Sequence, residues 1–246
     1  MEQTALKRPQ FFFTTAPLPC PYLSDRLERK IVTELTGPQS ESLHEVLAKG
    51  GFRRSHSIAY APACPGCKAC VPVRVNVEQF EMKRSLTRTW KRNRDITAHV
   101  VPARATAEQF ELFNEYQRSR HSASDMANMG FYEYSAMVED SPIDTYLIEF
   151  RNPASDLVAV CLTDQTDDGL SAVYSFFSSD YTGDGLGNFV ILWLIEYARA
   201  QNLPYVYLGY WIEESPKMAY KVRFRPLEAL GPQGWGPIED AYPNTV

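Results

Sequence analysis

The sequence predicts a mixed α/β fold, of the α+β kind, built around a sheet in the second half of the chain. Three strand-like segments separated by turn signals follow one another there: residues 144–150, 157–163 and 171–177. A Gly-rich loop at 183–187 then opens a nearly all-apolar helix at 189–200. A short buried strand is expected next, at 204–210.

Three strands, a Gly-rich loop, a helix and a further strand is the element order of the N-acetyltransferase-like (GNAT) fold. We expect residues 105–246 to form this domain. It begins with a helix over 106–121, where Thr106 and Gln109 can form a capping box. A short helix is expected over 215–221, with a serine cap and a proline at its first position. Element order alone fixes chemistry only loosely.

Residues 1–104 are expected to form an N-terminal subdomain that carries a cysteine cluster and a basic stretch. Apolar residues three or four positions apart, followed by glycines that end a helix, predict helices over 25–35 and 42–49. A basic helix is expected over about 84–94. Strands are expected over 52–60 and 71–77.

Charge divides the 246-residue chain unevenly, although the net charge is only −5. Residues 1–104 carry 17 Lys and Arg against 9 Asp and Glu, while residues 105–246 carry 8 against 21. This asymmetry favours a polyanion partner held by the first half, with chance clustering as the alternative. No signal peptide or membrane-spanning run is present, so we expect a cytoplasmic protein with no membrane partner.

Four cysteines form the sharpest local motif. Cys64, Cys67 and Cys70 follow one another at two-residue intervals, and Cys20 is the candidate for a fourth ligand. In a reducing compartment this pattern indicates an iron–sulfur cluster or a zinc site rather than disulfides. Four reduced thiols are the alternative. The fifth, Cys161, is expected to be a core residue.

The basic stretch could follow a nucleic-acid backbone. It holds five cations that we predict to contact nucleic-acid phosphates: Arg84, Arg88, Lys91, Arg92 and Arg94. Trp90 lies among them and could stack on an unpaired base. A solvated basic face is the alternative.

The Gly-rich loop lacks the cation that enzymes of this fold use to bind the pyrophosphate of acetyl-CoA. It carries Asp180 and Asp184 instead. Since carboxylates repel a pyrophosphate, a CoA thioester is disfavoured as acyl donor, and another activated acyl group is favoured. A simple turn before a core helix is the alternative.

Several stretches, in one order, resemble the aminoacyl-tRNA–protein transferases, and more closely their bacterial aspartate/glutamate leucyltransferase branch. They are PCPYL at 19–23, the cysteine loop, RNRD at 92–95, FNEYQRSRH at 113–121, YVYLGYWI at 205–212, SPKMAYK at 215–221 and FRPLE at 224–228. The family pattern Tyr-Asp-Pro-Asp after the third strand reads Phe177-Ser178-Ser179-Asp180 here, so only Asp180 is retained.

The resemblance implies that leucine passes from leucyl-tRNA to the N-terminal amine of proteins that begin with Asp or Glu, marking them for degradation by the N-degron pathway. No cofactor is required for this chemistry, and no DNA is involved. The catalytic candidates are Asp180, as proton acceptor, and three tyrosines that could hydrogen-bond the substrates: Tyr207, Tyr210 and Tyr220.

Recognition of the acceptor's acid group needs a cation, and the cationic candidates inside family motifs are Arg74, Arg120, Lys217 and Lys221. His121 is grouped with Arg120, and Trp211 is the candidate for stacking on the 3′-terminal adenosine. Three other readings remain open at this point: arginine as the donor amino acid, an acyl-CoA-dependent N-acyltransferase, and a non-enzymatic iron–sulfur or zinc protein that regulates by binding RNA.

Overall fold

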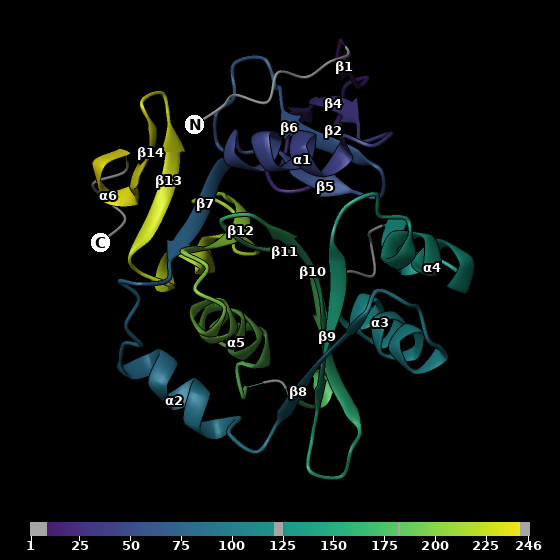
Figure 1. The fold of residues 1–246 in the computed structure, drawn as a ribbon, viewed down its shortest axis with the longest axis vertical. Coiled ribbons are helices and arrows are strands. Elements are labelled where there is room, and N and C mark those ends of the chain that lie inside the picture. Colours follow the sequence, from purple (N-terminus) through teal and green to yellow (C-terminus); the bar gives the residue numbers. More distant parts are fainter. Residues whose placement is uncertain (1–8, 121–124, 182, 242–246) are drawn as a thin grey trace.

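The protein is built around an eight-stranded sheet (Figure 1). The computed structural model describes residues 9–120, 125–181 and 183–241. The strand order is β14-β13-β7-β12-β11-β10-β9-β8. The bounds are β7 Val71–Asn76, β8 Thr97–Pro102, β9 Thr145–Arg151, β10 Leu157–Thr166, β11 Gly169–Phe177, β12 Tyr205–Trp211, β13 Leu227–Gly231 and β14 Gly234–Pro237. The succession β9, β10, β11, α5 and β12 confirms the GNAT-like element order.

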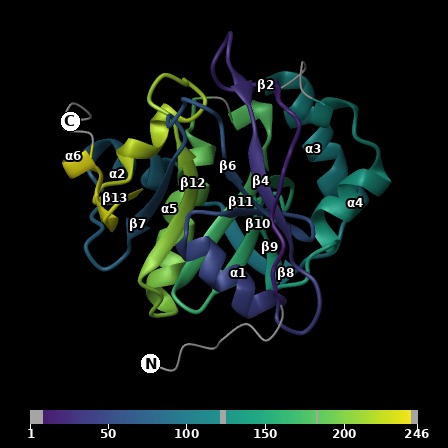
Figure 2. The same ribbon diagram turned by 90° about the horizontal axis from the view of Figure 1, so that it is seen from above.

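Helices cover both faces of this sheet (Figures 1 and 2). On one face lie α5 (Leu186–Ala200) and α2 (Arg84–Arg92), and on the other lie α3 (Ala107–Arg120) and α4 (Phe131–Glu139). Because successive side chains of a strand point to opposite faces of the sheet, the same strands contribute residues to the cores on both faces. On β9, Ile148 joins the core around α5, while its neighbour Leu147 joins the core with α3 and α4.

The N-terminal region adds a four-stranded sheet in the order β1-β4-β6-β5, covered by α1 (Ser40–Lys49). Its strands are β1 Phe13–Thr14, β4 Lys30–Glu34, β5 Arg53–Ser55 and β6 Ile58–Pro62, and a small hairpin joins β2 Leu18–Pro19 to β3 Leu27–Glu28. The region lies on the sheet face opposite α5. Leu170 and Val206 point into the α5 core, whereas Ser171 and Tyr207 line a pocket with His44 and Arg53.

A buried ion pair fastens this region to the large sheet. Arg54 on β5 donates to both carboxylate oxygens of Asp164 on β10, at 2.8 and 2.6 Å. Thr145 on β9 donates to the same carboxylate at 2.8 Å. Because both charges are buried and paired, removal of either partner would leave an uncompensated charge inside the protein.

Several predicted elements are confirmed, including the strands at 71–77 and 204–210 and the all-apolar helix α5. The capping box at the start of α3 is present as well: Gln109 N–H donates to Thr106 Oγ1 at 3.2 Å, and Thr106 N–H donates to Gln109 Oε1 at 3.0 Å. In the described residues no helix is long and apolar enough to cross a bilayer.

Two predicted helices are wrong. Residues 25–35 form β3 and β4, because the β-branched run Ile31-Val32-Thr33 pairs with β6 and the fourth-residue spacing spans only three leucine or isoleucine positions. Residues 215–221 form a turn followed by the 3₁₀ helix η3 (Ala219–Arg223). The strand expected over 52–60 is a hairpin of β5 and β6.

The predicted division at residue 104 passes through the large sheet. Strand β7 lies before it and pairs with β12 and β13, and β8 lies before it and pairs with β9. The two parts therefore share one sheet, and the division stays a prediction about the chain's organisation.

The centre of the sheet contains a divergence between two parallel strands. Only three residues of β11 pair with β12: Gly169 with Tyr205, Leu170 with Val206, and Ser171 with Tyr207. Beyond Ser171 no pairing between the two strands is present in the described residues, and β12 has a register irregularity at Gly209. β11 remains paired with β10 on its other side, but its backbone groups that face β12 need partners from elsewhere beyond Ser171.

Candidate functional site

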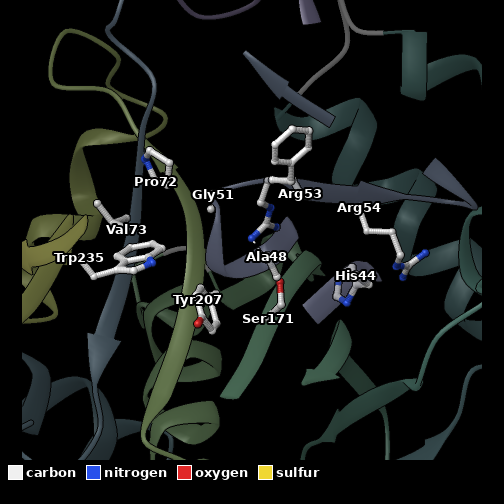
Figure 3. Close-up of a pocket in the computed structure, with 12 residues that line it drawn as sticks. His44, Ala48, Gly51, Arg53, Arg54, Pro72, Val73, Ser171, Tyr207 and Trp235 are labelled. Atoms are coloured by element: carbon white, nitrogen blue, oxygen red, sulfur yellow. Dashed lines mark hydrogen bonds between the residues drawn. The ribbon is translucent and has the colours of Figure 1, made fainter. Parts of the chain in front are cut away.

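Arg53 of β5 supplies those partners. Its Nη2 donates to the carbonyl oxygens of Ala172 at 2.6 Å and Val173 at 3.2 Å. Its Nη1 lies 3.5 Å from Ser171 Oγ (Figure 3). On the other strand the guanidinium lies against Gly209, where a Cβ atom would come within 2.8 Å of Arg53 Cζ. Gly209 also has a φ of +73°, so both space and backbone conformation require glycine there.

Lys221 of η3 approaches the same place from the side of β12. Its Nζ donates to the carbonyl oxygen of Tyr210 and lies 3.4 Å from Met218 Sδ. Lys221 is buried, with only 6% of the residue exposed. Burial, followed by the positive charge of Arg53, lowers the pKa of Lys221 to about 7, and Cys70 acts in the opposite direction.

Aromatic side chains lie near the far end of β11. The rings of Tyr116 and Phe177 are 5.0 Å apart, and the guanidinium of Arg120 lies 5.4 Å from the Phe177 ring. Tyr220 is 37% exposed. Burial of its hydroxyl, followed by the nearby Tyr116, raises the pKa of Tyr220 to about 12. Tyr116, Arg120 and Tyr220 therefore border one region, although they come from α3 and η3.

Asp180 lies on the short 3₁₀ turn η2 (Ser179–Tyr181) that follows β11, and its side chain is exposed. Two neighbours shape this turn. Asp180 N–H donates to Ser178 Oγ at 3.2 Å, and Glu115 Oε1 on α3 accepts from Ser179 N–H at 3.0 Å and from Ser179 Oγ at 2.5 Å. Sequence analysis missed Glu115, because nothing in its local pattern distinguishes it from other exposed helix carboxylates.

The Gly-rich loop receives from α2 the cation that its own sequence lacks. Arg92 Nη1 donates to the carbonyl oxygen of Gly183 at 2.5 Å, and its Nε lies 3.7 Å from the carboxylate of Asp184. Asn93 Nδ2 donates to the Asp184 carbonyl oxygen at 2.9 Å. Gly183 and Gly185 adopt positive φ angles of +100° and +72°. The loop is thus held by protein groups, and Arg92 is engaged in holding it.

Comparison with known proteins places the chain among transferases. Residues 18–88 match the family model "Arginine-tRNA-protein transferase, N terminus", and residues 108–231 match "Arginine-tRNA-protein transferase, C terminus". The chain belongs to this family. The predicted division at residue 104 falls between the two matched segments.

Three relatives are named aspartate/glutamate leucyltransferase. The protein of Paramagnetospirillum magneticum is 62% identical over 96% of each chain. That of Rhodospirillum rubrum is 58% identical over 96% of each chain, and that of Gluconacetobacter diazotrophicus is 55% identical over 97% of this chain and 92% of its own. The chain therefore belongs to the leucyltransferase branch that the sequence motifs indicated.

Not all family-motif residues meet at the end of β11. Arg74 forms an ion pair with Glu228 at 2.7 Å and stacks on Tyr205, 3.4 Å from the ring. The hydroxyl of Tyr207 accepts from Arg74 Nη1 at 3.2 Å and donates to Asp168 at 3.0 Å. This network lies beside the start of β11, whereas Asp180 follows its end, roughly 25 Å away at strand rise. Arg74 and Tyr207 therefore do not share a site with Asp180.

Tyr210 and Trp211 also have structural surroundings. The hydroxyl of Tyr210 lies 3.0 Å from the backbone carbonyl oxygen of Gly51, to which it donates, and 3.3 Å from the backbone carbonyl oxygen of Tyr60. These contacts tie β12 to the N-terminal region. Burial raises the pKa of Tyr210. Trp211 is 2% exposed and belongs to the main core. A ring packed in this way is not available to stack on the 3′ adenosine, so that prediction is corrected.

The predicted pairing of Lys217 with Lys221 in one pocket is also corrected. Lys217 is exposed on the turn before η3, while Lys221 is buried, because the expected α-helix is absent. His121 lies outside the described residues.

The cysteines gather in one region without forming a metal site. Cys64 Sγ lies 3.3 Å from Arg29 N, and Arg26 Nη1 donates to Cys67 Sγ at 3.3 Å. Burial, followed by the neighbouring Cys20, Cys64 and Cys67, raises the pKa of Cys70 to about 11. Within the described ranges, however, no three Cys, His, Asp or Glu side chains are arranged to hold a metal ion. The residues as placed do not support the predicted iron–sulfur or zinc site.

The cations of α2 face solvent as predicted. Arg84, Arg88, Lys91 and Arg94 are exposed, and Arg94 lies 3.6 Å from Asp95. Trp90 is different, since its half-buried ring packs 5.3 Å from that of Phe189 on α5. The stretch thus presents charge outward and uses its tryptophan to fix the helix on the core.

The lowered pKa of Lys221 predicts a specific pH dependence of stability. Below pH 7 both folded and unfolded chains hold the proton, so the cost of burying the charge is felt in full. Between pH 7 and about 10.4 the unfolded chain holds more protons than the folded one, so wild-type stability rises with pH through this group. The stability advantage of Lys221→Met over wild type should therefore shrink between pH 6 and pH 10 in urea unfolding. A pH-independent difference would contradict the assignment.

Proposed function

We propose that this protein transfers leucine from leucyl-tRNA to the α-amine of proteins whose first residue is Asp or Glu, and so marks them for degradation by the N-degron pathway. The observation that carries the proposal is the 62% identity, across 96% of both chains, to a protein named aspartate/glutamate leucyltransferase. A reaction that consumes aminoacyl-tRNA also supports a cytoplasmic location. The partners would be leucyl-tRNA and the acceptor protein, with neither DNA nor membrane.

The reaction is aminolysis of an ester. A C–N bond forms between the acceptor amine and the leucyl carbonyl carbon, the C–O bond to the tRNA 3′ oxygen breaks, and that oxygen takes a proton. An α-amine has a pKa near 8, so on the order of a tenth is free base at pH 7. A modest proton acceptor and good positioning of amine and ester therefore suffice, with no cofactor needed for the chemistry.

Asp180 is our candidate for the proton acceptor. Its exposed carboxylate lies on a turn that Glu115 and Ser178 hold in place at the end of β11. Tyr220 is the tyrosine best suited to hydrogen-bond the acyl carbonyl, because burial keeps its hydroxyl protonated and a third of the residue remains exposed. Arg120 borders the same region and Lys217 is exposed nearby in the chain, so both remain candidates for contacting substrate.

The exposed face of α2 is our candidate for tRNA binding. It carries Arg84, Arg88 and Lys91 on a helix packed against α5, and α5 begins at the Gly-rich loop. Arg92 would act differently from these three, since it holds the loop and leaves the phosphate contacts to its neighbours.

A transfer assay read by mass spectrometry tests the proposal. Purified protein is mixed with leucyl- or arginyl-tRNA and with peptides that begin with Asp, Glu, Lys or Ala. Leucine should be added to the Asp and Glu peptides alone. Addition of arginine instead would keep the family and change the donor. If neither amino acid is transferred by folded protein that still binds tRNA, an RNA-binding regulator becomes the better description.

The role of Asp180 predicts a defect in turnover rather than binding. Asp180→Asn removes the proton acceptor at nearly constant size, so kcat should fall about 100-fold while KM for leucyl-tRNA stays unchanged. Asp140→Asn, at an exposed carboxylate after α4, is the matched control and should behave as wild type. A normal kcat in Asp180→Asn would remove this residue from the mechanism.

The role of α2 predicts a change in salt dependence. In the triple variant Arg84→Gln, Arg88→Gln, Lys91→Gln, the slope of log Kd for tRNA against log salt should decrease by about 2 to 3. The reason is that each phosphate contact releases about one counterion when it forms, and the variant forms three fewer contacts. The exposed Arg118 on α3 provides the control, and Arg118→Gln should leave the slope as it is. An unaltered slope in the triple variant would show that this face is only solvated.

A further inference from the structure

Two cations from distant parts of the chain meet at neighbouring residues of β12. Arg53 comes from β5 and packs against Gly209, with 2.8 Å between its Cζ and a Cβ built on that glycine. Lys221 comes from η3 and donates to the carbonyl oxygen of Tyr210, the next residue. Both side chains therefore lie where β11 and β12 separate, although they are 168 positions apart in the sequence.

Neither cation has an acidic partner among the residues that the structure describes. Arg53 donates to two carbonyl oxygens and lies near one hydroxyl, and Lys221 contacts a carbonyl oxygen and a thioether sulfur. The buried arginines of this region do have acids: Arg54 pairs with Asp164 at 2.6 Å and Arg74 with Glu228 at 2.7 Å. Arg53 is half-buried and always charged, and Lys221 has a lowered pKa that an anion beside it would raise again. Because charges withdrawn from water are normally paired, these two groups indicate a place prepared for an anion.

We infer that Arg53 and Lys221 together bind the acidic side chain of the acceptor's first residue. This inference rests on the proposed transfer of leucine to Asp- and Glu-initiated proteins, and it assigns the recognition of that acid to a pair that includes a residue outside the family motifs. Arg53 offers the guanidinium donors that are not bonded to β11, and Lys221 offers a point charge. A carboxylate has two oxygens, which can accept one hydrogen bond from each cation.

Enclosure of the pair favours a carboxylate over a tRNA phosphate. Lys221 is only 6% exposed, and its neighbour in the chain, Tyr220, is 37% exposed. A side chain of one or two methylene groups can reach such a position, whereas a nucleotide backbone needs an open, solvent-accessible track. The exposed cations of α2 provide a surface of that second kind.

The same pair explains why an amide should be rejected. Asn and Gln match Asp and Glu in shape, but they leave both cations unneutralised in a poorly hydrated place. Sites with buried charged groups discriminate strongly against ligands that leave those groups unpaired. The acid-versus-amide preference is therefore the property that the pair should control.

The test compares Asp- and Asn-initiated peptides in wild type and in Lys221→Met. In the variant, kcat/KM for the Asp peptide should fall about 10- to 100-fold, the loss typical of one hydrogen bond to a charged group, while kcat/KM for the Asn peptide stays unchanged. Lys221→Arg keeps the charge and should retain the preference for Asp. The matched control is Arg223→Met, which removes an exposed cation from the same short helix and should leave both values as in wild type.

Other outcomes separate the possible failures. An equal loss with both peptides, accompanied by a higher KM for leucyl-tRNA, would place tRNA rather than the acceptor on Lys221 and overturn the inference. An unchanged Asp preference in folded Lys221→Met would overturn it as well. If wild type itself transfers leucine to neither peptide, the proposed function has failed instead.

A measurement on the unaltered protein covers the case in which a variant does not fold. Succinate and its neutral diamide, succinamide, are compared as inhibitors of wild-type transfer to the Asp peptide. Succinate should inhibit competitively with the peptide and succinamide should not. Equal inhibition by both, or competition with leucyl-tRNA, would contradict a carboxylate site.

Discussion

The hydrogen bonds from Arg53 to β11 are the interaction on which the centre of the structure depends. Parallel pairing of β11 with β12 ends after three residues, so the carbonyl oxygens of Ala172 and Val173 have no partner on β12 in the described structure. Such groups are costly to leave unpaired away from water. The guanidinium of Arg53 satisfies both, and Gly209 on the other strand leaves it room. The sheet can therefore divide without losing its backbone bonding.

This arrangement makes the N-terminal region part of the site. The neighbouring Arg54 pairs with Asp164 on β10, so consecutive residues of one short strand hold two strands of the large sheet. The divergence then brings together Arg53 from β5 and Lys221 from η3, while Glu115 on α3 fixes the turn that carries Asp180. On the opposite face, α2 closes the Gly-rich loop through Arg92. Division of the chain at residue 104 would separate Arg53, Arg54 and Arg92 from their partners in the second half.

Sequence reasoning was most successful where a signal is local. The capping box of Thr106 and Gln109, and the all-apolar run of α5, depend on residues three or four positions apart and reappear in the structure. It failed at 25–35, where apolar spacing suggested a helix but β-branched residues pair with β6. It also failed at Lys217 and Lys221, because their shared helical face depended on a helix that is a turn and a 3₁₀ helix instead.

The sequence by itself determined the order of the main elements, the branch of the family and the exposed charge of α2, because each of these is written in neighbouring residues or in ordered motifs. Only the tertiary structure decided which polar groups meet. It placed Arg74 and Tyr207 away from Asp180 and Trp211 inside the core, and it brought in Arg53, whose partners on β11 lie about 119 positions away. Periodicity reports that a side chain is turned inward, but not what lies opposite it, and the partner of a buried charge is set by the folding of distant segments onto each other.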